Sequence, residues 1–161
     1  MTTTFIQRIE IAREAENKVI GILYWNNKQV CRVGQENWLP EWIHKIIRFK
    51  YEKGIEMIKH FPDLSTNKAL IQVKCAPESD DYSCVTIESA SFDSSKVLSD
   101  FGIPVLIIWL LQDKSLFGNW VNDISTQEPD TDREDTGGSH TPYLLVSKSN
   151  LHPFRDFLHL L

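Results

Sequence analysis

The chain has 161 residues, of which 42% are hydrophobic and 24% are charged, and this length and composition are typical of one globular domain with a sizeable core. The longest apolar run, Ile103–Leu111, falls well short of the ~20 residues of a membrane-spanning helix, and the first ten residues lack the basic and apolar regions of a secretory signal. The net charge of −5 disfavours a protein that is coated with positive charge for nucleic acid.

Charge and cysteine content refine these limits. Residues 41–74 contain seven Lys or Arg against four Asp or Glu, whereas residues 128–135 contain five acids and one Arg, so a basic working surface is compatible with the negative total. The three cysteines form no close pairs. They argue against a disulfide framework and a zinc finger, and they indicate a reducing, cytoplasmic setting.

The first predicted element is an amphipathic helix over residues 5–25, because apolar side chains recur there at steps of three and four. Glu16 is the exception in this apolar stripe. Helical geometry places it between Ala12 and Val19 on the buried side, which makes it a candidate functional residue.

The next segment contains an ambiguity that affects the site. A short strand at 29–33 and a helix over about 41–53 are followed by Gly54. Either the helix continues through Phe61, or a strand occupies 55–61. The strand is preferred, because glycine is a poor residue for a helix interior.

The remaining elements alternate between extended and helical patterns. They are a turn at 63–68, a strand at 69–76, a turn at 77–81, a partner strand at 82–89, a helix at 93–101, a fully buried strand at 104–111, a mobile acidic loop at 122–140, a strand at 143–147 and a C-terminal helix with Leu151, Phe154, Phe157 and Leu161 inward. This order predicts a single domain, residues 1–161, of the α/β (α+β) class with a central mixed β-sheet flanked by helices.

Four polar side chains point inward from elements of this predicted fold. Because side chains alternate along a strand, Gln72 and Lys74 share one face, and a lysine there is costly unless it meets an anion or solvent. In the preceding predicted strand, Glu56 shares a face with His60. Glu16 is the fourth inward group.

The chemistry of these groups is complementary. Carboxylate and amide oxygens are hard ligands that suit Mg²⁺ or Mn²⁺, and a neighbouring lysine can stabilise a developing oxyanion or help to activate water. Metal-assisted hydrolysis of a phosphodiester uses this combination.

Three short motifs resemble the PD-(D/E)XK superfamily, the restriction-endonuclease-like nucleases. They are G-I-E-M-I at 54–58, L-I-Q-V-K at 70–74, and I-P-V-L-I-I at 103–108 with Trp120 after it. The sequence looks most similar to a branch of uncharacterised bacterial proteins with a G-I-D pattern on one strand and Q-V-K on the next. The resemblance covers most of the chain and implies a restriction-endonuclease-like core.

The resemblance also implies site residues. Glu56 occupies the position of the metal-binding acid, Gln72 and Lys74 correspond to the third motif, and Glu16 corresponds to a glutamate of the first helix. The sequence departs from the pattern at position 56, where the family has Asp. Asp63, in Pro62-Asp63 nine residues before Gln72, is a rival metal ligand if the helix runs through Phe61.

The implied function is a Mg²⁺- or Mn²⁺-dependent endonuclease that hydrolyses DNA. Related folds usually cut DNA with two active sites, so the resemblance implies a homodimer or higher oligomer, with the C-terminal helix as a candidate interface and no membrane partner. The alternative is a catalytically inactive nuclease-fold module that binds nucleic acid or a protein. The glutamate at position 56 and the negative net charge favour this alternative.

Overall fold

The structure is a computed structural model that describes residues 5–34, 58–75, 83–128 and 142–161. Its elements are α1 (Phe5–Trp25), β1 (Val30–Arg32), β2 (Leu64–Thr66), β3 (Leu70–Cys75), β4 (Cys84–Glu88), α5 (Ser89–Asp100), β5 (Val105–Leu110), β6 (Leu116–Trp120), η1 (Val121–Asp123), β7 (Thr126–Gln127), β8 (Tyr143–Ser147), η2 (Lys148–Asn150), β9 (His152–Pro153) and η3 (Phe154–Phe157). No helix within these ranges is long and apolar enough to cross a membrane.

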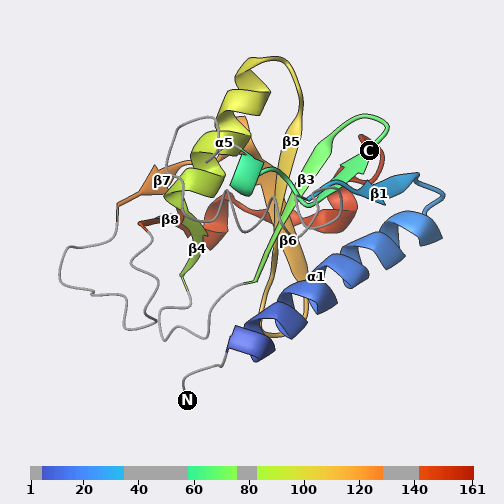
Figure 1. The fold of residues 1–161 in the computed structure, drawn as a ribbon, viewed down its shortest axis with the longest axis horizontal. Coiled ribbons are helices and arrows are strands. Elements are labelled where there is room, and N and C mark those ends of the chain that lie inside the picture. The colour runs from blue at the N-terminus through green and yellow to red at the C-terminus, as the bar shows by residue number, and fades with distance from the viewer. Residues whose placement is uncertain (1–4, 35–57, 76–82, 129–141) are drawn as a thin grey trace, which may run out of the picture.

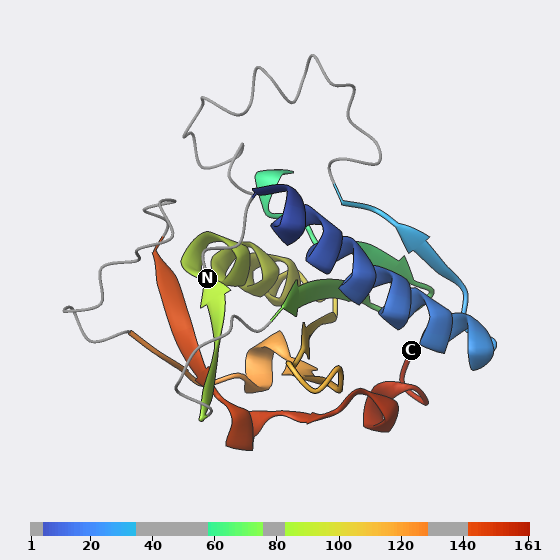
Figure 2. The same cartoon turned by 90° about the horizontal axis from the view of Figure 1, so that it is seen from below.

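Two sheets organise the described part of the chain. The larger sheet has the strand order β1-β2-β3-β5-β6-β9, and within it β3 and β5 are parallel while the other pairs are antiparallel. The smaller, antiparallel sheet has the order β4-β8-β7. Helix α1 packs on one face of the larger sheet, and α5 and the smaller sheet pack on the opposite face (Figures 1 and 2). The predicted central mixed sheet flanked by helices is confirmed.

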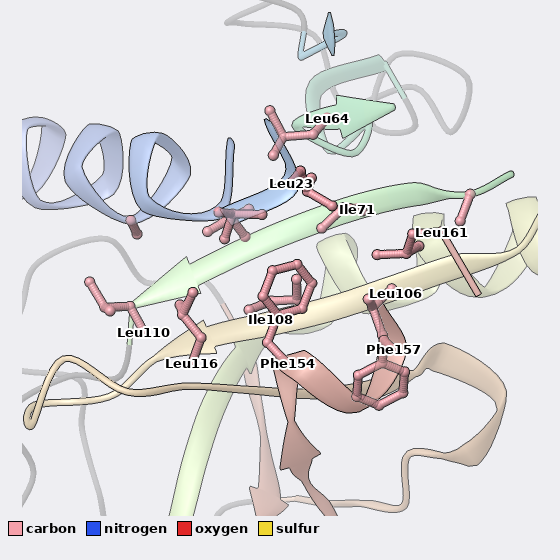
Figure 3. Packing of buried hydrophobic residues seen from close by; sticks show 14 residues of the cluster. Leu23, Leu64, Ile71, Leu106, Ile108, Leu110, Leu116, Phe154, Phe157 and Leu161 are labelled. Carbon is pink, nitrogen blue, oxygen red and sulfur yellow. The ribbon is translucent and has the colours of Figure 1, made fainter. Parts of the chain in front are cut away.

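Strand β5 divides the core into two halves. All six of its residues are buried, as the uninterrupted apolar run predicts for a strand covered on both faces. Leu106, Ile108 and Leu110 pack on the α1 side, and the alternate residues Val105, Ile107 and Trp109 pack with Leu98 of α5 and the smaller sheet. Figure 3 shows the α1-side cluster, where Leu23 and Ile71 approach Ile108 and Phe154.

The C-terminal segment is buried as predicted but is not an α-helix. It forms η2, β9 and η3, and Pro153 explains the interruption because proline has no N–H to donate and clashes with the preceding turn of a helix. Phe154, Phe157 and Leu161 lie in the α1-side core (Figure 3). These apolar side chains are therefore used within the chain, which removes the argument that they form an interface.

The preferred strand at 55–61 is wrong wherever the structure describes it. Ile58 and Lys59 are helical, and the next strand is β2, inside the segment predicted as a turn. Leu64 is the one apolar residue of β2, and its strand conformation comes from pairing on both sides with β1 and β3. The predicted helix at 41–53 lies outside the described residues.

Other differences concern pairing and boundaries. The predicted partner of β3 at 82–89 is a strand, but β4 pairs with β8 in the smaller sheet, because long-range pairing overrides the local turn pattern. Helix α5 begins at Ser89 instead of residue 93, and β6 was not predicted. Strand β7 lies inside the predicted loop at 122–140, of which residues 129–140 are outside the described ranges.

Gly118 of β6 allows the central strands to approach each other. It is paired with Ile108, and a Cβ atom built on it would lie 2.3 Å from the backbone oxygen of Ile107. We expect Gly118→Ala to lower the free energy of unfolding by about 3 kcal/mol, because the β5–β6 ladder must shift to relieve the overlap. Urea denaturation measures this change.

The matched control is Gly21→Ala on the exposed side of α1. No heavy atom lies within 4 Å of the added methyl group, and alanine is the better helix residue, so stability should rise by about 0.5–1 kcal/mol. Equal stability of the two variants would contradict the proposed close approach at Gly118.

Candidate active site

The candidate site lies where the β2–β3 ladder ends. The last paired residues are Leu64 and Ile71, so the backbone N–H of Val73 needs another acceptor. The Asp63 carboxylate supplies it, since Oδ2 accepts a hydrogen bond from the Val73 N–H at 2.6 Å. The Asp63 side chain thus bonds to the β3 backbone just beyond the last β2–β3 pair, and its carboxylate lies beside β3.

The position of Asp63 is fixed from both sides. Its backbone oxygen accepts hydrogen bonds from the N–H groups of Val33, at 2.9 Å, and Gly34, at 3.2 Å. On its other side, Oδ2 also accepts from Nε2 of Gln72 at 2.8 Å. The structure therefore joins two of the predicted site residues, Asp63 and Gln72, directly.

Gln72 contains an unusual acceptor. The residue is only 4% exposed, and its Oε1 has no hydrogen-bond partner within the described ranges. Buried polar atoms are nearly always paired, so an orphaned acceptor needs an explanation. A cation bound beside the Asp63 carboxylate would satisfy this oxygen.

Lys74 lies on the same face of β3 as Gln72. These residues are in register with Trp109 and Ile107 of β5, which pack on the α5 side. The Lys74 Nζ donates to Oγ of Ser91 at 3.0 Å. The prediction that Gln72 and Lys74 lie on the same face of the strand is therefore confirmed.

Glu16 is placed differently. Its neighbours Ala15 and Val19 pack in the α1-side core, on the sheet face opposite Gln72 and Lys74. Glu16 is 9% exposed, as its inward position predicts, but its carboxylate is paired with the guanidinium of Arg32. Arg32 also donates to Oδ1 of Asn17 at 2.7 Å.

The five predicted residues thus divide into three groups. Asp63 and Gln72 are hydrogen-bonded to each other, and Lys74 lies on the same face of β3 as Gln72. Glu16 lies on the other face with Arg32, and Glu56 lies outside the described residues.

The donor set at the β3 edge fits a Mg²⁺ ion held by few protein ligands. Within the described ranges, no group of three or more His, Cys, Asp or Glu side chains could hold a metal alone. Mg²⁺, however, keeps several waters and is usually bound by one or two carboxylates together with substrate phosphates. The Asp63 carboxylate and the Gln72 oxygen, which has no partner in the described part of the chain, match that pattern.

Cys75, next to Lys74, is not suited to nucleophilic chemistry. Burial raises the pKa of its thiol, and the Glu14 carboxylate adds to the shift. The thiol therefore stays protonated near neutral pH, whereas the thiolate is the reactive form.

Sequence reasoning missed three residues that lie close to predicted site residues: Glu88, Ser91 and Arg32. Ser91 bonds to Lys74 and Glu88, and Arg32 pairs with Glu16. One signal was available for Ser91, because the segment Ser89–Asp100 places several serines on the buried side of an amphipathic helix, where apolar residues are usual. Nothing local marks Arg32 or Glu88.

Two solved structures share the fold of this chain. Hjc, a Holliday junction resolvase from Archaeoglobus fulgidus, matches with a TM-score of 0.55 and 10% identity over 92% of this chain and 95% of Hjc. D212, a nuclease from a fusselovirus, matches with a TM-score of 0.52 and 14% identity over 99% of this chain and 92% of D212. No protein-family model and no curated protein sequence matches the chain. The restriction-endonuclease-like fold predicted from the sequence is confirmed.

Proposed function

We propose that this protein is a metal-dependent endonuclease that hydrolyses phosphodiester bonds in DNA. The observation that carries the proposal is the hydrogen bond from Nε2 of Gln72 to Asp63, together with the Gln72 oxygen Oε1, which is buried and has no partner among the described residues. The Lys74 ammonium lies on the same face of β3. The nuclease activities of Hjc and D212, which have this fold, support it.

Each residue has a distinct role in this proposal. Asp63 and Gln72 would hold a Mg²⁺ or Mn²⁺ ion, which when bound polarises the phosphoryl oxygen and makes water a better nucleophile. Among the described residues, Lys74 uses one N–H on Ser91, which leaves two to face the negative charge that develops on the phosphate. Water attacks the phosphorus and gives up a proton to solvent, while the bond from phosphorus to the leaving sugar oxygen breaks and that oxygen takes up a proton from solvent.

The first test is cleavage of a four-way DNA junction, the matching linear duplex and a single strand, each with Mg²⁺, Mn²⁺ or EDTA. We expect cleavage with either metal and none with EDTA. The junction is included because Hjc is a Holliday junction resolvase. If the protein binds these DNAs but cuts none of them, the endonuclease proposal fails and the catalytically inactive module is favoured.

Paired cuts on two strands need two active sites, and we propose that they come from a homodimer. Light scattering of the protein at the concentrations used for cleavage should give twice the mass of the chain. A monomer that still makes paired cuts would contradict the dimer and leave the endonuclease intact.

A further inference from the structure

A buried serine connects Lys74 to two further titratable side chains. Ser91, in the first turn of α5, is 1% exposed. Its Oγ lies 3.0 Å from Nζ of Lys74, 3.2 Å from Oε2 of Glu88 and 3.1 Å from Nδ1 of His60. A fourth contact joins His60 to Glu88 directly, with His60 Nδ1 and Glu88 Oε2 3.6 Å apart.

Chemistry sets the direction of these hydrogen bonds. An ammonium group can only donate and an ionised carboxylate can only accept. Lys74 therefore donates to Ser91, and the Ser91 hydroxyl donates its one hydrogen to Glu88. The second lone pair of Ser91 accepts from His60, which requires the tautomer with a proton on Nδ1.

We propose that Ser91 is a positioning residue, which holds the Lys74 ammonium in the active site and is itself held by Glu88 and His60. This inference rests on the proposed function. A lysine ammonium is a compact charge at the end of a flexible four-carbon chain. A fixed hydrogen-bond acceptor is therefore needed to keep the ammonium in one place. Ser91 is suited to this because its backbone is fixed by the junction of β4 and α5.

The central variant is Ser91→Ala, which removes the acceptor and leaves Lys74 in place. The matched control is Ser95→Ala, one turn further along α5. Ser95 is also fully buried, but its Oγ has no partner within the described ranges. Both variants lose one buried hydroxyl, and only the first loses the bond to Lys74.

We expect Ser91→Ala to lower kcat by about 10- to 100-fold, since small misplacements of a catalytic group have effects of this size, with KM close to the wild-type value. Ser95→Ala should leave both constants unchanged. In a Lys74→Met background, Ser91→Ala should cause no further loss, because its effect passes through Lys74. An equal loss in both backgrounds would overturn the proposal.

A second readout needs no activity. Reductive methylation followed by mass spectrometry compares Lys74 with the exposed Lys68, and Lys74 should react faster in Ser91→Ala than in the wild type. Unchanged Lys74 reactivity would overturn the proposal even if cleavage is robust. If the wild type cuts no DNA but Lys74 reactivity rises, the proposed function fails while the Ser91–Lys74 contact stands. Glu88→Ala, at a half-exposed side chain, is the second variant if Ser91→Ala does not fold.

Discussion

An Asp63→Asn variant should cut DNA at least ~10³-fold more slowly than the wild type, because it removes the carboxylate that we propose as the metal ligand at the end of the β2–β3 ladder. The fold should survive. Both hydrogen bonds from Val73 and Gln72 end on the same oxygen, Oδ2, and the carboxamide oxygen of asparagine can accept both. The measurement is the single-turnover cleavage rate together with the melting temperature with and without Mg²⁺.

Metal binding gives this variant a second signature. A site that binds Mg²⁺ only in the folded state raises the melting temperature, and Asp63→Asn should abolish that rise. Asp123→Asn is the matched control, since it removes one exposed carboxylate from η1 and should change neither quantity. Wild-type cleavage by Asp63→Asn would return the role of metal-binding acid to Glu56, and Glu56→Gln would then be the variant to lose activity.

The parts of the fold that sequence predicted correctly are those specified locally. Helix α1 follows from the three- and four-residue spacing of its apolar residues, and β5 follows from its uninterrupted apolar run. Strand β2 could not be found in this way. Its Leu-Ser-Thr sequence resembles a turn, and pairing with β1 and β3 makes it a strand.

In the candidate site, too, only the locally specified features could be predicted from the sequence. The period of a strand was sufficient to place Gln72 and Lys74 on one face. The choice between Glu56 and Asp63 depended on where the preceding helix ends. Ile58 and Lys59 are helical and Asp63 contacts Gln72, which is why we propose Asp63 as the acid.

Contacts between elements could not be predicted at all. The bond from Lys74 to Ser91 joins β3 to α5 across 17 positions of the chain, and it depends on how α5 packs over the sheet. The pairing of Glu16 with Arg32 depends likewise on the contact between α1 and β1. No local pattern encodes either distance.

Lys74→Met should lower the cleavage rate by about 10²- to 10³-fold, the usual effect of removing one group that stabilises charge in the transition state. Methionine keeps an unbranched side chain of similar length, so the packing beside Trp109 is retained. Ser91 loses the lysine as a donor but keeps its bonds with Glu88 and His60. The cleavage rate at saturating DNA and the melting temperature of the variant test this expectation.

Lys68→Met is the matched control, because the same substitution in the exposed turn between β2 and β3 should leave cleavage unchanged. The response to metal then separates the role of Lys74 from that of Asp63. Removing a positive charge beside a cation site cannot weaken cation binding electrostatically, so the rise in melting temperature with Mg²⁺ should persist or increase in Lys74→Met, whereas Asp63→Asn should lose it. If Lys74→Met loses the rise as well, the lysine supports the fold of the site, and its assignment to the transition state is wrong.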